Sequence, residues 1–204
     1  MSTKSRYVKT MSKQRGAVLL ASLLILLVMT MLGVTSMESG GLQMKMTSNT
    51  RERQIAFETA EIVLATIEQE IQDFPFDSDQ LQDCVSGDAD CFDDTCAGGL
   101  CFNGTFPVGS DFLSCGLEAD DDGPTDYWED DTLWASAARH LTKNLPNVDN
   151  DPKYIIEFLC YVQPDESTAL SATVGSPYFR ITTLAESNGG KAEVMLQSTY
   201  RRGD

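Results

Sequence analysis

The stretch EADDDGPTDYWE at residues 118–129 places acidic side chains at regular intervals around a glycine. Three carboxylates alternate with other residues, Gly123 follows the third, and Glu129 comes six residues after the glycine. This spacing matches the calcium loop of EF-hands, D-x-[DN]-x-[DN]-G-x₅-E, except that Glu118 replaces the first aspartate. In such loops alternate side chains converge on the ion and the last glutamate binds through both oxygens. The predicted ligands are Glu118, Asp120, Asp122, Pro124 (backbone carbonyl), Asp126 (through a water) and Glu129.

A second interpretation of these residues is a solvated acidic loop, because acidic spacings arise easily by chance in a chain so rich in aspartate. The preceding stretch FLSCGL is also too short for the incoming helix of an EF-hand, and it contains a cysteine. Calcium is the only cofactor predicted, and it would bind in a loop outside the complete helix–loop–helix frame.

Six cysteines form the other group of reactive side chains. An even number in an oxidising compartment indicates disulfides, and six allow fifteen connectivities between which the sequence does not choose. A zinc site is the competing interpretation, but the chain has no C-x-x-C pair and a single histidine, His140. We therefore predict disulfides, which involve Cys84, Cys91, Cys96, Cys101, Cys115 and Cys160.

The sequence does not indicate catalysis. A single histidine provides no obvious acid–base pair, and neither a nucleophile elbow nor a phosphate-binding loop is present. The chain is predicted not to be an enzyme, with an anchored periplasmic enzyme or binding domain as the alternative from another class. Trp128 and Trp134 are interpreted as core residues, and the terminal Arg-Gly-Asp at residues 202–204 as a solvated tail.

The charge distribution excludes one class of partner. The chain has 31 acidic and 15 basic residues, a net charge of −16, and its first sixteen residues carry five bases and no acid. The remainder therefore carries −16 − 5 = −21, with no lysine or arginine between Arg53 and Arg139. Such a surface repels phosphate backbones, so we predict no direct binding to nucleic acid.

Residues 17–37, AVLLASLLILLVMTMLGVTSM, carry no charge. As a helix they span about 30 Å, the thickness of one bilayer core. Bases precede them and Glu38 is the first acid, which orients the N-terminus toward the cytoplasm and all the cysteines to the other side. A cleavable signal peptide usually has a shorter apolar stretch, although the small residues of GVTSMESGG would permit cleavage. An uncleaved signal anchor is a further alternative.

Residues 38–72 are predicted to continue the helix in amphipathic form. Apolar residues three and four positions apart form a stripe along one face. Gly40 and Gly41 could bend or melt the helix just outside the bilayer, and Pro75 ends it. The predicted stripe consists of Phe57, Ala60, Leu64, Ile67 and Ile71.

Two parts of the chain resemble type IV pilins. At KQRG|AV a basic leader ends in Gly16 and the apolar segment begins at Ala17, as in prepilins, which a membrane peptidase cuts after the glycine. RERQIAFETAE at residues 51–61 and the C-terminal VMLQSTYRR are similar to the PilX family of minor pilins. The resemblance covers residues 14–64 and about the last ten residues.

The resemblance implies cleavage between Gly16 and Ala17 by the prepilin peptidase, and methylation. It implies a single-pass inner-membrane protein with a periplasmic domain, which later joins an extracellular pilus. The implied partners are other minor pilins and the major pilin, and the implied role is initiation of pilus assembly, with pilus-dependent adhesion and twitching motility. A minor pseudopilin of type II secretion is the alternative.

The chain departs from most pilins at two positions. The first residue after the cleavage site is usually aromatic and the fifth is glutamate, but here they are Ala17 and Ala21. In the family, the glutamate neutralises the N-terminal amine of a neighbouring subunit within an apolar core, where an unpaired charge is costly. A subunit without it suits a place at or near the filament tip, with nothing above it. Alternatively, Ala21 faces lipid and reports nothing about position.

The predicted fold is α+β and pilin-like, with a long N-terminal helix and an antiparallel sheet. The strands are KYIIEFLCYVQ, PYFRITTLAE and KAEVMLQSTYRR, the last two joined by a hairpin turn at residues 187–190. TLWASAARHLTKNLP is predicted as a short helix, and the residues from 73 to 124 as loops stapled by disulfides. The predicted divisions are a leader (1–16), a transmembrane part (17–37), an amphipathic part (38–72) and a globular domain (73–204).

Overall fold

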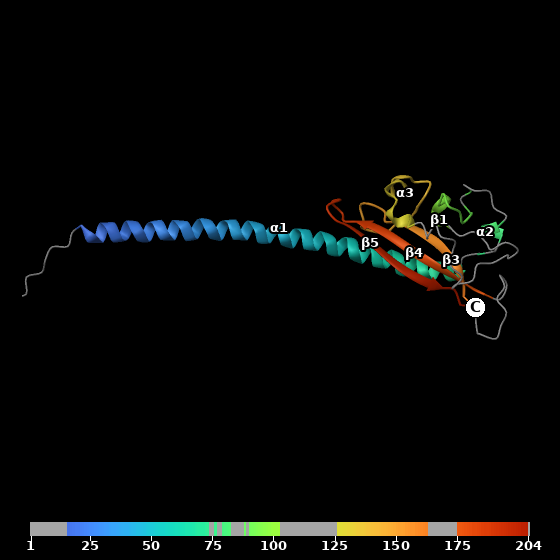
Figure 1. Ribbon diagram of the computed structural model, residues 1–204. Coiled ribbons are helices and arrows are strands. Elements are labelled where there is room, and N and C mark those ends of the chain that lie inside the picture. Colours follow the sequence, from blue (N-terminus) through green and yellow to red (C-terminus); the bar gives the residue numbers. More distant parts are fainter. Residues whose placement is uncertain are drawn as a thin grey trace, which may run out of the picture. The chain divides into compact units, whose positions relative to one another are not determined.

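The computed structural model describes residues 16–73, 76, 79–82, 88, 90–102, 126–162 and 175–203. The chain divides into two compact units, Met1–Ser48 and Asn49–Asp204. One helix, α1 (Ala17–Asp73), begins in the first unit and ends in the second (Figure 1). It runs through Gly40 and Gly41 as helix, so the melting considered for these glycines is not a feature of the structure.

In the first unit, α1 is mainly apolar, and every residue of it whose exposure is described is exposed. Its most apolar 18-residue stretch has a mean hydropathy of 2.7, so length and composition suit a helix that crosses a membrane. The hydroxyls of Ser22, Thr30 and Thr35 donate to helix carbonyls three or four residues back, at 2.8–3.1 Å. These polar groups are therefore satisfied without water, as a lipid environment requires.

In the second unit, α1 buries one face in the main core. The buried apolar side chains follow intervals of four, three, four and four residues, as expected for one face of a helix. They are Ala56, Ala60, Val63, Ile67 and Ile71.

The predicted apolar stripe on this helix is therefore only partly correct. Ala60, Ile67 and Ile71 are buried, and Leu64 is half-buried against the core. The prediction for Phe57 is wrong, because this side chain is 41% exposed, and Ala56 is buried in its place. A helix turns by about 100° per residue, so this difference of one residue rotates the buried face away from Phe57.

Among the described residues, the sheet of the second unit has five strands. Four of them lie side by side in the order β1-β3-β4-β5, and the fifth, β2, also pairs with β3. The strands β3 (Lys153–Val162), β4 (Ser176–Glu186) and β5 (Glu193–Arg201) form an antiparallel meander, which confirms the three predicted strands. Two short strands, β1 (Leu100–Cys101) and β2 (Leu141–Thr142), pair with β3. Because β1 is parallel to β3, the sheet is mixed and not wholly antiparallel as predicted.

The hairpin between β4 and β5 closes as predicted. The amide of Gly190 donates to the carbonyl of Ser187 at 2.8 Å, and Gly190 has a φ of +61°. This left-handed conformation suits glycine, which has no Cβ to clash with the backbone.

The helix predicted within residues 132–146 is mostly wrong. The structure has a short helix, α3 (Asp131–Ala135), after which the chain turns and enters β2. Asp130 caps α3 by accepting a hydrogen bond from the amide of Thr132 at 2.8 Å, although the sequence had indicated Asp131 or Thr132 as the cap. Leu133, Ala137, Leu141 and Leu145 recur every four residues, which predicted the longer helix, but Leu141 pairs with Tyr154 in the sheet instead.

The remaining described elements are short. They are α2 (Asp79–Gln82), and two 3₁₀ helices, η1 (Ala97–Gly99) and η2 (Tyr127–Glu129).

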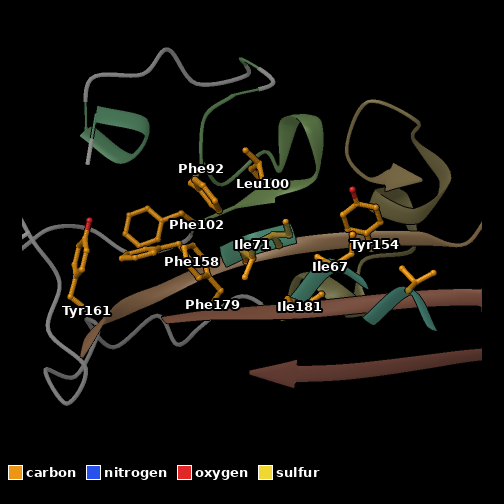
Figure 2. Close-up of a cluster of buried hydrophobic side chains, with 12 residues drawn as sticks. Ile67, Ile71, Phe92, Leu100, Phe102, Tyr154, Phe158, Tyr161, Phe179 and Ile181 are labelled. Carbon is orange, nitrogen blue, oxygen red and sulfur yellow. The ribbon is translucent and has the colours of Figure 1, made fainter. Parts of the chain in front are cut away.

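Two apolar clusters occupy the two faces of the sheet, because successive side chains of β3 alternate. Tyr154, Ile156 and Phe158 belong to the main cluster, which includes Ile67 and Ile71 of α1 (Figure 2). Ile155, between them in the sequence, belongs to the second cluster. That cluster also holds Cys96, Cys101, Tyr127, Leu133, Trp134 and Leu184, with Trp128 and Met195 packed against it.

Candidate functional site

One candidate surface is the face of α1 that the sheet leaves uncovered. Phe57 is 41% exposed and Ile62 is 54% exposed, although both follow the apolar part of the helix, whose length and composition suit a membrane span. Large apolar side chains on the outside of a helix are a feature of surfaces that contact a partner. The chain itself provides no cover for either side chain among the described residues.

Polar contacts to the sheet determine which face of α1 stays free. Ser198 donates to Glu68 at 2.6 Å, and Gln72 donates to the hydroxyl of Tyr200. Lys143 pairs with Glu70, and the buried hydroxyl of Thr183 donates to the carbonyl of Ala60. These contacts lie along the last four turns of the helix, so its rotation about its own axis is fixed.

The cysteines form a stapled loop at the edge of the sheet. A disulfide joins Cys96 to Cys101, which encloses η1 and most of β1. The amide of Gly98 donates to the carbonyl of Ala138 at 2.8 Å, and Gly99 has a φ of +77°. A Cβ on Gly99 would lie 2.9 Å from both the backbone nitrogen and a side-chain carbon of Leu141, so this loop lies directly against β2.

The predicted disulfides are confirmed at this loop. Cys91 and Cys160 are disulfide-bonded as well. Cys84 and Cys115 lie outside the described residues, so the complete connectivity stays a prediction.

Arg139 ties the stapled loop to α3. Its Nε donates to the carbonyl of Thr95 at 2.7 Å, and its guanidinium pairs with Asp130 at 2.9 Å. Hydrogen bonds from Thr132 and the Arg139 guanidinium hold the pKa of Asp130 below its usual value. His140 follows in a bend and not in a helix, is buried, and has Nδ1 3.2 Å from the carbonyl of Leu133.

Only part of the predicted calcium loop is described. Asp126 precedes η2, and Glu129 is its last residue, with the Glu129 amide donating to the Asp126 carbonyl at 2.9 Å. Glu118, Asp120, Asp122 and Pro124 lie outside the described residues. Within the part of the chain that the structure describes, no three His, Cys, Asp or Glu side chains could hold a metal ion.

A polar cluster, here called the Glu157 cluster, was not predicted from the sequence. It consists of Tyr127, Trp128, Glu157 and Arg180. Arg180 and Glu157 face each other across β3 and β4, with a guanidinium nitrogen 3.4 Å from a carboxylate oxygen. Burial raises the pKa of Glu157 to about 7, although Arg180 opposes this shift, and Asp126 adds to it. A signal was present, since Glu157 is the one acid inside the apolar strand KYIIEFLCYV.

A cavity of about 560 Å³ lies in the main core on the α1 side of β3. Its lining is mainly apolar, from Ile67, Leu100 and Ile156 among others. The carboxylate of Glu70, which also lines it, already pairs with Lys143. Gln80 and Asp90 contribute further polar side chains to the lining.

At the other end of the chain, Gly16 forms a turn and Ala17 begins α1, and both are exposed. Two protein-family models match the chain. The model described as PilX N-terminal covers residues 15–65, and the model described as Type IV pilus assembly protein PilX C-term covers residues 97–202.

The chain belongs to the PilX family. The two models together cover the apolar part of α1, its amphipathic part as far as residue 65, most of the stapled loop and the whole sheet. No curated protein and no solved structure matches the chain. Membership of the PilX family makes the protein a minor pilin of the type IV pilus, a structural class, and implies contact with other pilus components.

Proposed function

We propose that this PilX-family protein helps to initiate pilus assembly at or near the tip of the filament. Two observations support this proposal. The helix α1 is continuous, and position 21, near the start of its apolar segment, is an alanine and not a glutamate. A subunit of this kind stacks on others through its helix but offers no charge to the N-terminal amine of a subunit above. The family favours this role over that of a secretion pseudopilin.

The exposed side chains Phe57 and Ile62 are proposed to contact the helices of neighbouring pilins, minor or major. Their burial would remove apolar area from water, at about 25 cal/mol per Å². Adhesion and motility would then follow from the pilus that the protein helps to build.

A position at the tip predicts few copies of this protein per filament, and more copies for the variant Ala21→Glu. Deletion of the gene should remove most filaments, and sheared filaments should contain far fewer copies of this protein than of the main subunit, measured by quantitative mass spectrometry. Ala21→Glu should raise the copy number several-fold, because the new carboxylate can neutralise the amine of a following subunit.

Ala21→Gln is the matched control, since it has a similar size without the charge, and it should leave the copy number unchanged. Equal abundance of the wild-type protein and the main subunit would refute the proposal. An increase with Ala21→Gln as large as that with Ala21→Glu would remove the argument from charge.

We also propose that residues 118–129 bind calcium. The support from described residues is that Glu129, the last predicted ligand, belongs to η2 and is separated from α3 by one residue, Asp130, much as a helix follows the loop of an EF-hand. We expect a dissociation constant of roughly 0.1–1 mM, the range of extracellular modules. Isothermal calorimetry on the full chain in detergent is the measurement.

Asp120→Ala and Glu129→Ala should each abolish the heat of calcium binding, because each removes a predicted ligand. Asp131→Ala, in α3 just outside the loop, is the control and should bind as the wild type does. Absence of heat at millimolar calcium, or binding that survives both ligand substitutions, would dismiss this site.

A further inference from the structure

The Glu157 cluster lies on the face of the sheet opposite α1. Glu157 is two residues beyond Ile155, a member of the second apolar cluster, so both side chains point to that face. The strand register places Cys101 of β1 on one side of Glu157 and Arg180 of β4 on the other. Cys101 is in a disulfide, so Arg180 is the charged neighbour in this row.

The polar atoms of this cluster are buried and incompletely paired. Glu157 and Tyr127 are each 3% exposed. Among the described residues, three buried atoms lack a hydrogen-bond partner: Oε2 of Glu157, a guanidinium nitrogen of Arg180 and the hydroxyl of Tyr127. The ion pair is long, at 3.4 Å, so it does not replace the hydrogen bonds that an ionised carboxylate loses on leaving water.

The 3₁₀ helix η2 covers this pair. The guanidinium carbon of Arg180 lies 4.5 Å from the centre of the Trp128 ring, within the range of a cation–π contact. Trp134 donates from Nε1 to the carbonyl of Trp128 at 3.0 Å, which connects η2 to α3. The cover is three residues long, and its described backbone hydrogen bonds are local, from the amides of Glu129 and Asp130 to the carbonyls of Asp126 and Tyr127. It can therefore open without breaking a hydrogen bond of the sheet.

The charges around Glu157 come from several elements. Arg180 on β4 favours the ionised carboxylate, and Asp126, just before η2, opposes it. Asp93, Asp94 and Arg139 act on the neighbouring Tyr127 hydroxyl. Further along the same face lie Lys153 of β3, which donates to the carbonyl of Trp134, and Arg201 of β5, which donates to Ser176.

We propose that the Glu157 cluster is a pH-dependent switch: with Glu157 neutral, η2 lies closed over β3 and β4, and with Glu157 ionised, η2 opens locally. Opening admits water to the carboxylate, to the Arg180 guanidinium and to the Tyr127 hydroxyl together. The surface that moves is formed by residues 126–129. This inference does not depend on the position of the protein in a filament.

The direction of the pH effect follows from the linkage between proton binding by Glu157 and closure of η2. The pKa of Glu157 rises from 4.5 to about 7 in the closed state, so the closed state binds the proton more tightly than the open state. The stabilisation of the closed state by the proton on Glu157 is therefore fully present below pH 4.5. It decreases as the pH rises toward 7 and no longer changes above that. With these two values the opening equilibrium increases by about 70-fold between pH 5 and pH 8.

The test is hydrogen exchange of the full chain in detergent micelles, with a calcium chelator present. Protection factors of the amides at residues 127–135, corrected for the intrinsic exchange rate at each pH, should fall about 70-fold from pH 5 to pH 8 and then stay constant. Glu157→Gln should give protection factors independent of pH in this range. Asp126→Asn, a surface substitution, should reduce the fall, because it removes a charge that raises the pKa of Glu157.

Glu193→Gln, on an exposed residue of β5, is the matched control and should behave as the wild type. A pH profile of Glu157→Gln or Asp126→Asn identical to the wild type would overturn the proposal. So would an equal loss of protection in the amides of β4, because that result would indicate global unfolding and not local opening.

Discussion

A chain carrying Gly16→Val should remain uncut in the inner membrane and be missing from sheared filaments. The predicted cleavage site lies between Gly16 and Ala17, at the junction of the basic leader and α1. A glycine is the residue that lets another backbone approach most closely, and valine adds a branched side chain there. Intact-mass measurement should show a wild-type chain that begins at Ala17 and a variant that keeps all sixteen leader residues.

Gly33→Ala, within the apolar half of α1, is the control for this experiment. A Cβ at Gly33 has no atom within 4 Å, so the variant should be cut and assembled normally. A wild-type chain that begins beyond Met37 would identify an ordinary signal peptide and contradict the prediction. Complete cleavage of Gly16→Val after Gly16 would contradict the role given to the glycine.

Phe158→Ala should destabilise the second unit by about 3–5 kcal/mol, the usual cost of emptying an aromatic core position. Phe158 is 2% exposed and lies at the centre of the main core. Its ring contacts five others at centroid distances of 5.1–6.5 Å. These rings belong to Phe76, Phe92, Phe102, Tyr161 and Phe179. Urea denaturation in detergent, followed by near-ultraviolet circular dichroism, measures the change.

Phe57→Ala is the matched comparison, since it removes the same side chain from an exposed position. It should change the free energy of unfolding by about 0.5 kcal/mol or less, as most surface substitutions do. It should nevertheless lower the number of copies in filaments if Phe57 contacts a neighbouring pilin. Equal destabilisation by Phe57→Ala and Phe158→Ala would contradict the burial of these two residues.

The parts of the fold that depend on local pattern were predictable. Strands β3, β4 and β5 have enough β-branched and aromatic residues to define them, and the two glycines at 189 and 190 identify the hairpin. The helix α1 follows from its length and from its lack of proline before residue 75. Each of these features requires only residues that are neighbours in the chain.

The parts that depend on distant contacts were not predictable. Leu141 has the spacing of a helical residue, but its pairing with Tyr154 determines its conformation. The parallel strand β1 exists because the stapled loop brings Leu100 beside Ile156, 56 positions further along the chain. Likewise, whether Phe57 or Ala56 meets the core depends on the contacts that fix the rotation of α1.

The functional features can also be separated into those that follow from local sequence and those that depend on distant contacts. The resemblance to the family rests on short motifs near the two ends of the chain, and the family models extend it through residues 97–202. The Glu157 cluster, in contrast, is assembled from η2, β3 and β4, which are separated in the sequence by loops. A single acid in an apolar strand indicates a special environment, but only the register identifies Arg180 as its partner.

The hydrogen bond between Glu68 and Ser198 joins residues 130 positions apart, so the order of synthesis matters. A ribosome that adds about 5–20 residues per second needs about 7–26 s to make that interval. The helix therefore leaves the ribosome well before β5 exists, with Val63, Ile67 and Ile71 still uncovered. For these seconds the apolar face of α1 lacks the completed sheet, and any substitution that slows completion of the sheet lengthens the period in which the chain is vulnerable to aggregation and proteolysis.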